Sequence, residues 1–204
     1  MSDCGDVQAV VVAIRAGRPV ILPTDTVYGL CAMPDRPEPT ELLYRLKGRD
    51  PLQPSALLAA DLDVLLECVP ELRGRAGVIA RALLPGPYTL VLPNPARRYP
   101  WLTGSNRHAI GVRVPVLPAL AAQVLAEVGA VVATSANAPG EPDPARLDDV
   151  PEELRAQAAA VLDGGPLPGI PSTVIDFTGR EPRILREGAA AAADAIDRAG
   201  AALA

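Results

Sequence analysis

The chain has 204 residues, of which 49% are hydrophobic and 21% charged. Burial can therefore offset the entropy of ordering, which excludes a wholly disordered chain, and the length suits one domain spanning residues 1–204. The net charge of −5 argues against a surface that attracts nucleic acid over its whole area, so we expect any anion site to be local.

Helices and short apolar strands alternate along most of the chain, and strands then follow one another near the end. Asp6 can cap a first helix that Gly17 ends, and Pro23 stops the first strand. This order predicts an α/β fold with one twisted sheet of parallel and antiparallel strands and flanking helices. We expect helices at 7–16, 40–46, 72–84, 117–128, 152–160 and 189–204, and strands at 20–22, 55–60, 88–92, 109–114, 130–133, 172–177 and 183–185.

Polar residues gather in the loops that this pattern places beside the strands. The segments 24–29, 47–49 and 134–137 each lie next to an apolar strand, and loops at the carboxyl ends of strands commonly bind ligands. The segment 138–147 is rich in proline, which suggests a loop or lid.

Several common kinds of site are excluded. The chain contains no G-x-x-x-x-G-K-[ST], no dinucleotide-type G-x-G-x-x-G and no H-E-x-x-H motif. Cys4, Cys31 and Cys68 lack metal-ligand spacing, so we predict buried or inert thiols and no bound metal. The N-terminus lacks the basic start of a signal peptide and no apolar run is long enough to span a membrane, so we expect a cytoplasmic protein without a membrane partner.

Five motifs in this order resemble the YrdC family of threonylcarbamoyl-AMP synthases, from about Val12 to Gly188. They are PTDTVYGL at 23–30, LPGPYTLVL at 84–92, GVRVP at 111–115, TSAN at 134–137 and PSTVID at 171–176. The resemblance implies the short, single-domain form of the family, with a concave basic cleft. It also implies an enzyme that makes threonylcarbamoyl-adenylate and pyrophosphate from L-threonine, bicarbonate and ATP, with Mg²⁺ carried by the ATP. A separate tRNA threonylcarbamoyl transferase complex would then use the product.

The resemblance assigns L-threonine to four residues of the cleft. Thr26 contacts the bound amino acid, with Tyr28 as a candidate for the pocket wall, although Thr24 and Thr26 could instead satisfy turn amides. Arg113 binds the threonine carboxylate; an Arg in an apolar strand must be paired or ligand-bound unless that strand has one wet face. Ser135 and Ser172 meet threonine and the transferred group.

ATP is assigned to four further side chains. Lys47 and Arg49 could be solvated charges at a helix end, but in an extended connection their i, i+2 spacing would point both toward a triphosphate. Asn137 and Arg186 meet ATP by resemblance, although Ser135 and Asn137 could instead cap a turn. The residues proposed to act in catalysis are Lys47, Arg49, Ser135 and Asn137.

Four positions depart from the family pattern, and two other functions stay open. Asp50 stands where the family usually has Pro, Leu58 where long members carry a threonine-binding His, Ala109 replaces a hydroxyl residue, and Gln53 replaces a common Asn or Lys. The alternatives are an RNA-binding module, which the net acidity opposes, and a paralogue that forms a different carbamoyl or acyl adenylate. We expect His108 to be a surface or loop residue rather than a catalyst.

Overall fold

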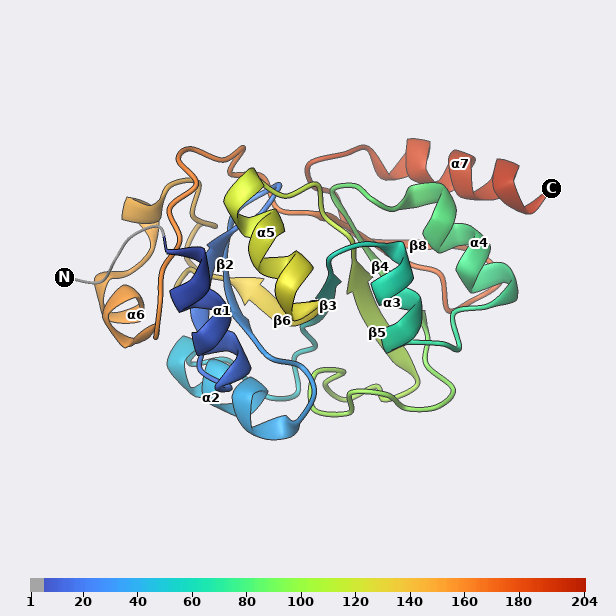
Figure 1. Cartoon of the computed structure of the whole chain (residues 1–204). Coiled ribbons are helices and arrows are strands. Elements are labelled where there is room, and N and C mark those ends of the chain that lie inside the picture. Colours follow the sequence, from blue (N-terminus) through green and yellow to red (C-terminus); the bar gives the residue numbers. More distant parts are fainter. Residues whose placement is uncertain (1–5) are drawn as a thin grey trace.

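The computed structural model describes residues 6–204, and the strands in this range form one twisted sheet (Figure 1). Its order is β1-β2-β6-β3-β5-β4-β7-β8, with β3/β5 and β4/β7 parallel and the other pairs antiparallel. The predicted mixed sheet with flanking helices is confirmed. The strands are β1 Val20–Pro23, β2 Tyr28–Ala32, β3 Ala56–Ala59, β4 Tyr88–Pro93, β5 Ala109–Arg113, β6 Ala130–Ser135, β7 Thr173–Asp176 and β8 Arg183–Arg186.

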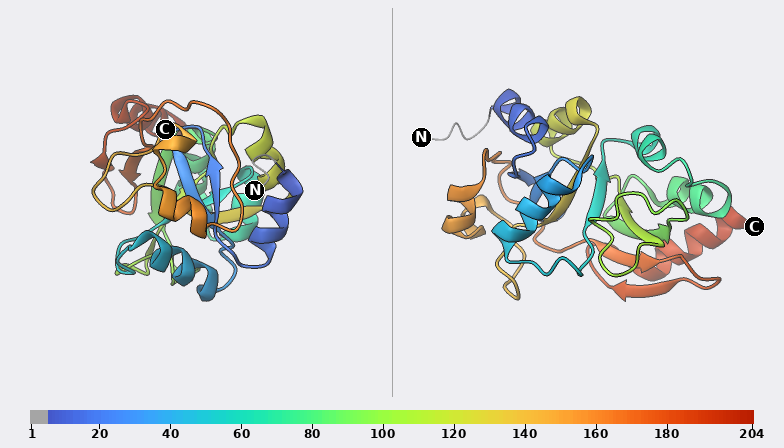
Figure 2. Two further views of the ribbon diagram at one scale, coloured as in Figure 1. Left: turned by 90° about the vertical axis from the view of Figure 1, so that its left-hand side faces the viewer. Right: turned by 90° about the horizontal axis from the view of Figure 1, so that it is seen from below.

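Two helices, α1 (Val7–Arg15) and α5 (Ala119–Val128), pack side by side over one end of one sheet face (Figures 1 and 2). Asp6 caps α1 as predicted, since its Oδ1 accepts a hydrogen bond from the Gln8 amide at 2.8 Å. Val10 and Ile14 of α1 are fully buried against the β1–β2–β6 end of the sheet. Among residues 6–204, α1 and α5 are the helices that contribute buried side chains to this smaller core.

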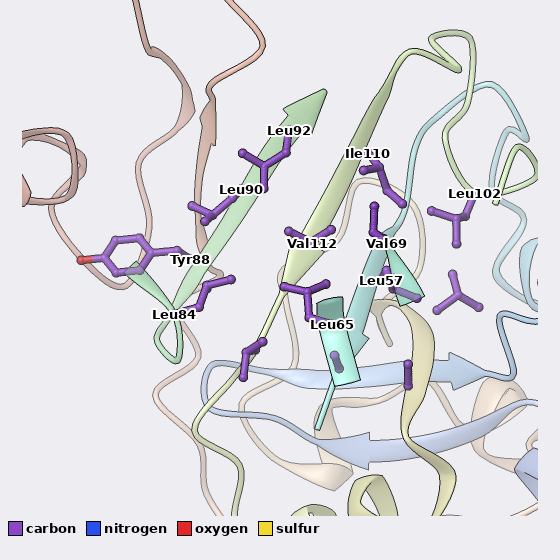
Figure 3. Close-up of a cluster of buried hydrophobic side chains, with 14 of the residues drawn as sticks. Leu57, Leu65, Val69, Leu84, Tyr88, Leu90, Leu92, Leu102, Ile110 and Val112 are labelled. Carbon is purple, nitrogen blue, oxygen red and sulfur yellow. The ribbon is translucent and has the colours of Figure 1, made fainter. Parts of the chain in front are cut away.

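The opposite sheet face is covered by α2 (Pro37–Lys47), α3 (Leu62–Cys68), α4 (Gly74–Leu83) and α7 (Ala192–Leu203). Figure 3 shows Leu57, Leu90 and Val112 from neighbouring strands in this core. Since successive side chains of a strand alternate between faces, Thr89 between Tyr88 and Leu90 points the other way. The larger core thus fixes which side chains face the open side of the sheet.

The structure corrects several predicted boundaries. Helix α2 continues through Lys47, because Gly48 adopts φ 63° and ends the helix in the left-handed conformation. Strands β2 and β6 include Tyr28 and Ser135, which we placed in loops. Helix α3 was missed; Asp61 caps it by accepting from the Val64 amide at 2.8 Å.

The segment between β6 and β7 is mostly irregular. It contains a short 3₁₀ turn at Leu147–Asp149 and helix α6 (Glu152–Gln157), which is shorter than predicted. Residues near Val161 then run beside β1, with a bridge between Ile21 and Val161. Within residues 6–204, no helix combines the length and apolar character needed to cross a membrane.

Candidate functional site

A cavity of about 430 Å³ lies on the sheet face turned away from the larger core. Its floor is made of small residues from four adjacent strands: Gly29, Ala133, Ala56 and Gly111. Larger side chains at these positions would fill the space above the sheet. The run of small residues therefore leaves a cleft of the size that small-molecule ligands usually occupy.

Six of the eight predicted site residues line this cleft: Thr26, Arg49, Arg113, Ser135, Ser172 and Arg186. They come from the β1–β2 loop, the α2–β3 connection and four different strands or strand starts. Lys47 and Asn137 do not line it. Arginines outnumber aspartates around the cavity, since Arg183 also lines it and its aspartates are Asp143 and Asp176.

Arg113 is paired at one end of the cleft. Its Nη2 donates to Asp25 Oδ1 at 2.7 Å and to Thr26 Oγ1 at 3.3 Å, and only 10% of its side chain and 9% of that of Asp25 are exposed. Burial raises the pKa of Asp25 and lowers the pKa of Arg113, while each partner's charge opposes the shift. The alternative of an exposed Arg113 on a wet strand face is therefore wrong. Sequence reasoning missed Asp25, although it lies between the two threonines of the first motif.

The hydroxyls of the two threonines in that motif make different hydrogen bonds. Thr24 Oγ1 accepts from the Thr26 and Val27 amides at 3.2 Å each and donates to the Val27 carbonyl at 2.7 Å, so it satisfies the turn. Thr26 Oγ1 lies 3.0 Å from Thr24 Oγ1 and within reach of Arg113. The turn alternative thus applies to Thr24, and the hydroxyl of Thr26 is held beside the arginine.

Lys47 binds the carboxyl end of β6 through its ammonium group. Its Nζ donates to the carbonyls of Ser135 at 2.5 Å and Asn137 at 2.8 Å and to Asn137 Oδ1 at 2.5 Å. Burial and the nearby charge of Arg49 lower the pKa of Lys47 to about 8, although Asp143 opposes this. The prediction that Lys47 and Arg49 share one side of an extended connection is wrong, because Lys47 is helical.

Asn137 joins this network to the following loop. Its Oδ1 also accepts from Ser135 Oγ at 2.6 Å, and its Nδ2 donates to the Glu141 carbonyl at 2.5 Å. The predicted lid segment, 138–147, is thereby tied to Lys47 through a single side chain.

Arg49 and Arg186 differ from Arg113 in the groups that hold them. Arg49 donates to the Pro54 carbonyl at 2.6 Å and to Thr134 Oγ1 at 3.4 Å, and Arg186 donates to the Ser172 carbonyl at 2.8 Å and to Ser172 Oγ at 3.2 Å. Among residues 6–204, neither guanidinium has a carboxylate within 4.0 Å. Burial lowers the pKa of Arg49. No carboxylate in the described part of the chain pairs with these two positive charges, which are suited to a phosphate.

Comparison with known proteins fits this geometry. The Sua5/YciO/YrdC family model, described as "Telomere recombination", matches residues 12–188. The chain belongs to this family.

Its relatives give the family a chemical context. The threonylcarbamoyl-AMP synthase of Stenotrophomonas maltophilia is 35% identical over 159 residues, which cover 76% of this chain and 83% of that protein. The structure of Pyrococcus abyssi Sua5 complexed with L-threonine has a TM-score of 0.81 at 32% identity and covers 89% of this chain but 54% of that one. Escherichia coli YciO has a TM-score of 0.80 at 26% identity, covering 91% and 90%.

Two of the positions that depart from the usual family pattern lie in the cleft. Leu58 and Ala109 both line it, so their substitutions alter the shape and polarity of the cavity itself. Gln53 is exposed and does not line the cavity.

Further lining residues that sequence reasoning missed are Thr89, whose Oγ1 lies 2.8 Å from Ser172 Oγ, and Asp143.

Other candidates lie away from the cleft. Tyr28 as a pocket wall is wrong: its ring is fully buried in the larger core, and its hydroxyl lies 2.8 Å from Asp163 Oδ1. His108 is exposed and does not line the cavity.

Cys31 is buried, which raises the pKa of its thiol to about 12. Cys68 is half-buried, and Cys4 lies outside the described residues. In the described part of the chain, no group of three His, Cys, Asp or Glu residues could hold a metal ion.

Proposed function

We propose that this chain is a threonylcarbamoyl-AMP synthase, which joins L-threonine, bicarbonate and ATP and releases pyrophosphate. The observation that carries the proposal is that one cleft holds the Arg113–Asp25 pair, flanked by hydroxyls, together with Arg49 and Arg186, which have no carboxylate of residues 6–204 within 4.0 Å. Membership of the family and the names of its relatives support the same reaction.

The Arg113 end is suited to the amino acid. A planar guanidinium recognises a carboxylate through parallel hydrogen bonds. Asp25 accepts from Nη2 of Arg113 alone, so part of the guanidinium can still donate to a ligand. Thr26 and Ser172 supply hydroxyls that can accept from the amine or donate to an oxygen. We assign the threonine carboxylate to Arg113 on this basis.

We assign the phosphates of the nucleotide to the arginines that lack a paired carboxylate. Arg49 and Arg186 would donate to phosphate oxygens, and Ser135 would meet the transferred group. Lys47 and Asn137 act by fixing the end of β6. Direct contact with ATP would require Lys47 to exchange one of its present acceptors on Ser135 or Asn137 for a phosphate oxygen. Mg²⁺ enters as part of MgATP.

The reaction needs no protein nucleophile. The threonine amine attacks the carbon of bicarbonate and water leaves, giving a carbamate. A carbamate oxygen then attacks the α-phosphorus of ATP, the bond to the β-phosphate bridge breaks, and pyrophosphate leaves. Charge grows on the α-phosphate oxygens in this step, so fixed guanidinium groups stabilise the transition state more than the ground state.

Three further features belong to this proposal. The segment 138–147, tied to Asn137, would limit the access of water to the carbamate. The product would pass to a separate tRNA threonylcarbamoyl transferase complex in the cytoplasm. Direct binding of RNA by this chain would be weak, because the net charge is −5.

The test is mass detection of the adenylate after incubation with ATP, bicarbonate and one amino acid at a time. Product and pyrophosphate should require both bicarbonate and L-threonine and should not require tRNA. Serine should be poorer by about 10-fold to 200-fold, since it lacks one methyl group. Equal rates with serine or another amino acid would favour the paralogue alternative, and steeply salt-dependent RNA binding without any adenylate would favour the RNA-binding module.

A further inference from the structure

Asp143 brings a negative charge to the wall of a cleft that is otherwise rich in arginine. The residue is partly buried, and among residues 6–204 its carboxylate makes no hydrogen bond and has no cation within 4.0 Å. The other lining carboxylate, Asp176, is already engaged. It accepts from the Thr178 amide at 2.8 Å and the Thr178 hydroxyl at 2.6 Å, and it pairs with Arg183. Asp143 is therefore the lining carboxylate that remains available to a ligand.

The backbone on both sides of Asp143 is fixed beside the end of β6. Two residues earlier, the Glu141 carbonyl accepts from Asn137 Nδ2 at 2.5 Å. One residue later, the buried Pro144 provides a carbonyl that accepts from the Tyr28 amide at 2.9 Å. The start of β2 pairs with the carboxyl end of β6, so both hydrogen bonds hold Asp143 at the same end of the cleft.

This end of the cleft is the one to which we assign the phosphates. Lys47 Nζ donates to the Ser135 carbonyl there, and Arg49 donates to Thr134 Oγ1 one residue earlier on β6. The charge of Asp143 also opposes the lowering of the Lys47 pKa, which agrees with this placement. A phosphate bound here without a metal would meet the carboxylate as a like charge, and a cation between the two would convert repulsion into attraction.

The coordination chemistry of Mg²⁺ suits a single carboxylate at a phosphate site. Mg²⁺ prefers oxygen ligands, keeps several water molecules, and is usually bound by one or two carboxylates together with substrate phosphates rather than by a protein cage. One aspartate beside the phosphates meets this requirement. The described part of the chain has no cluster of three His, Cys, Asp or Glu residues, so the metal would arrive with the nucleotide.

We propose that the Asp143 carboxylate binds the Mg²⁺ of MgATP, so that the cleft selects the magnesium complex over the metal-free nucleotide. This inference rests on the proposed function, which brings phosphates to the carboxyl end of β6. It gives the segment 138–147 a second task, because the loop that covers the carbamate also carries the protein ligand of the substrate's metal.

Isothermal titration calorimetry, without threonine, tests the proposal by comparing ATP binding in excess Mg²⁺ with ATP binding in EDTA. Asp143→Asn should weaken binding of MgATP about tenfold or more, since a metal site loses a charged oxygen. In EDTA the same variant should bind ATP more tightly than the wild type, on the order of fivefold, because a like charge is gone. Asp143→Glu, which keeps the charge, should retain the preference for MgATP. A purely structural role would not produce shifts of opposite sign.

Glu141→Gln is the matched control. It removes one negative charge from the same loop, but Glu141 is exposed and does not line the cavity, so the variant should bind like the wild type in both conditions. Equal weakening of ATP binding by Asp143→Asn with and without Mg²⁺ would point to a contact with the nucleotide itself, such as a ribose hydroxyl, and would overturn the proposal. Weakened binding of L-threonine with unchanged binding of MgATP would assign the carboxylate to the amine and would also overturn it.

The same titrations separate this inference from the proposed function. If the wild type binds ATP in neither condition, the proposed function fails and the inference fails with it. If the wild type binds MgATP and Asp143→Asn behaves like Glu141→Gln, the proposed function stands and only the role of Asp143 is wrong.

Discussion

The two ends of the cleft use the same side chain in opposite ways. At one end, Arg113 is almost fully buried and shares a hydrogen bond of 2.7 Å with Asp25. At the other, Arg49 is held by carbonyl and hydroxyl oxygens only, with no carboxylate of residues 6–204 within 4.0 Å. Arg186 also lacks such a carboxylate among these residues, but it lies nearer Arg113, where it donates to Ser172. The first arrangement is electrically balanced before any ligand binds, and the second is not.

This difference suggests how one cavity distinguishes two anions. A paired arginine offers directional hydrogen bonds with little net charge, which suits an amino-acid carboxylate next to its own ammonium or amine. Unpaired arginines offer net positive charge, which suits a polyphosphate. The pairing of each arginine, more than its presence, therefore indicates its ligand.

Breaking the pair at the Arg113 end should have the largest effect. Asp25→Ala leaves a buried guanidinium without its counter-ion, and we expect the free energy of unfolding to fall by about 3 to 5 kcal/mol in urea denaturation. The matched control is Glu71→Ala, because the Glu71–Arg98 pair is more exposed, at 26% and 40%, and its loss should leave the urea midpoint almost unchanged.

The second change in this comparison is Asp25→Ala with Arg113→Met, which removes both charges. It should recover part of the lost stability while threonine binding remains weak. Equal losses for Asp25→Ala and Glu71→Ala would mean that the Arg113 end is not preorganised by its ion pair.

Removing a cation from the other end should affect turnover more than folding. Arg49→Ala should lower kcat about a hundredfold, and at least as much as it lowers affinity for ATP, because the charge acts mainly as the transition state forms. Pyrophosphate release and thermal melting are measured side by side. Arg45→Ala, an exposed arginine one turn earlier on α2, serves as the control and should keep full activity. A variant that melts far earlier yet keeps its specific activity would make Arg49 structural.

The sequence predicts the order of strands and loops along the chain, but it does not predict which residues of different strands contact each other. Ser135 and Arg113 could be placed because apolar runs end beside them. The Asp25–Arg113 pair joins residues 88 positions apart, and only the sheet order brings them together. Local periodicity carries no information on such a contact.

The error at Lys47 has a different cause. Gly48 is a typical residue for the end of a helix, so the sequence did contain the signal that α2 reaches Lys47. The glycine that ends the helix outweighs the i, i+2 spacing of the two charges on either side of it. Helix α3 was missed for a similar reason, since Asp61 is a good N-cap before a short apolar stretch.

A pH titration should produce a smaller effect at the nucleotide end. The pKa of Lys47 is lowered to about 8, so the protonated form is lost as the pH rises through 8. Affinity for MgATP, measured without threonine, should be constant below that pH and fall above it by at most about tenfold per unit. Lys47→Met should bind more weakly at all pH values and show no change between pH 7 and 9. A flat profile for the wild type would place Lys47 outside the electrostatic field of the phosphates.

The smallest effect is expected from the only histidine in the chain. His108 is exposed, does not line the cavity and comes just before β5, with its carbonyl accepting from the Asn94 amide at 2.7 Å. The backbone makes that bond, so His108→Ala should preserve it and should change stability by no more than about 0.5 kcal/mol. Since positioning and fixed charge carry the proposed reaction, adenylate formation should stay within about twofold of the wild type. Rates measured from pH 6 to 8 should also superimpose on those of the wild type. A folded His108→Ala variant that forms no adenylate would require general acid–base catalysis by His108, and positioning and fixed charge in the cleft could then not account for the chemistry.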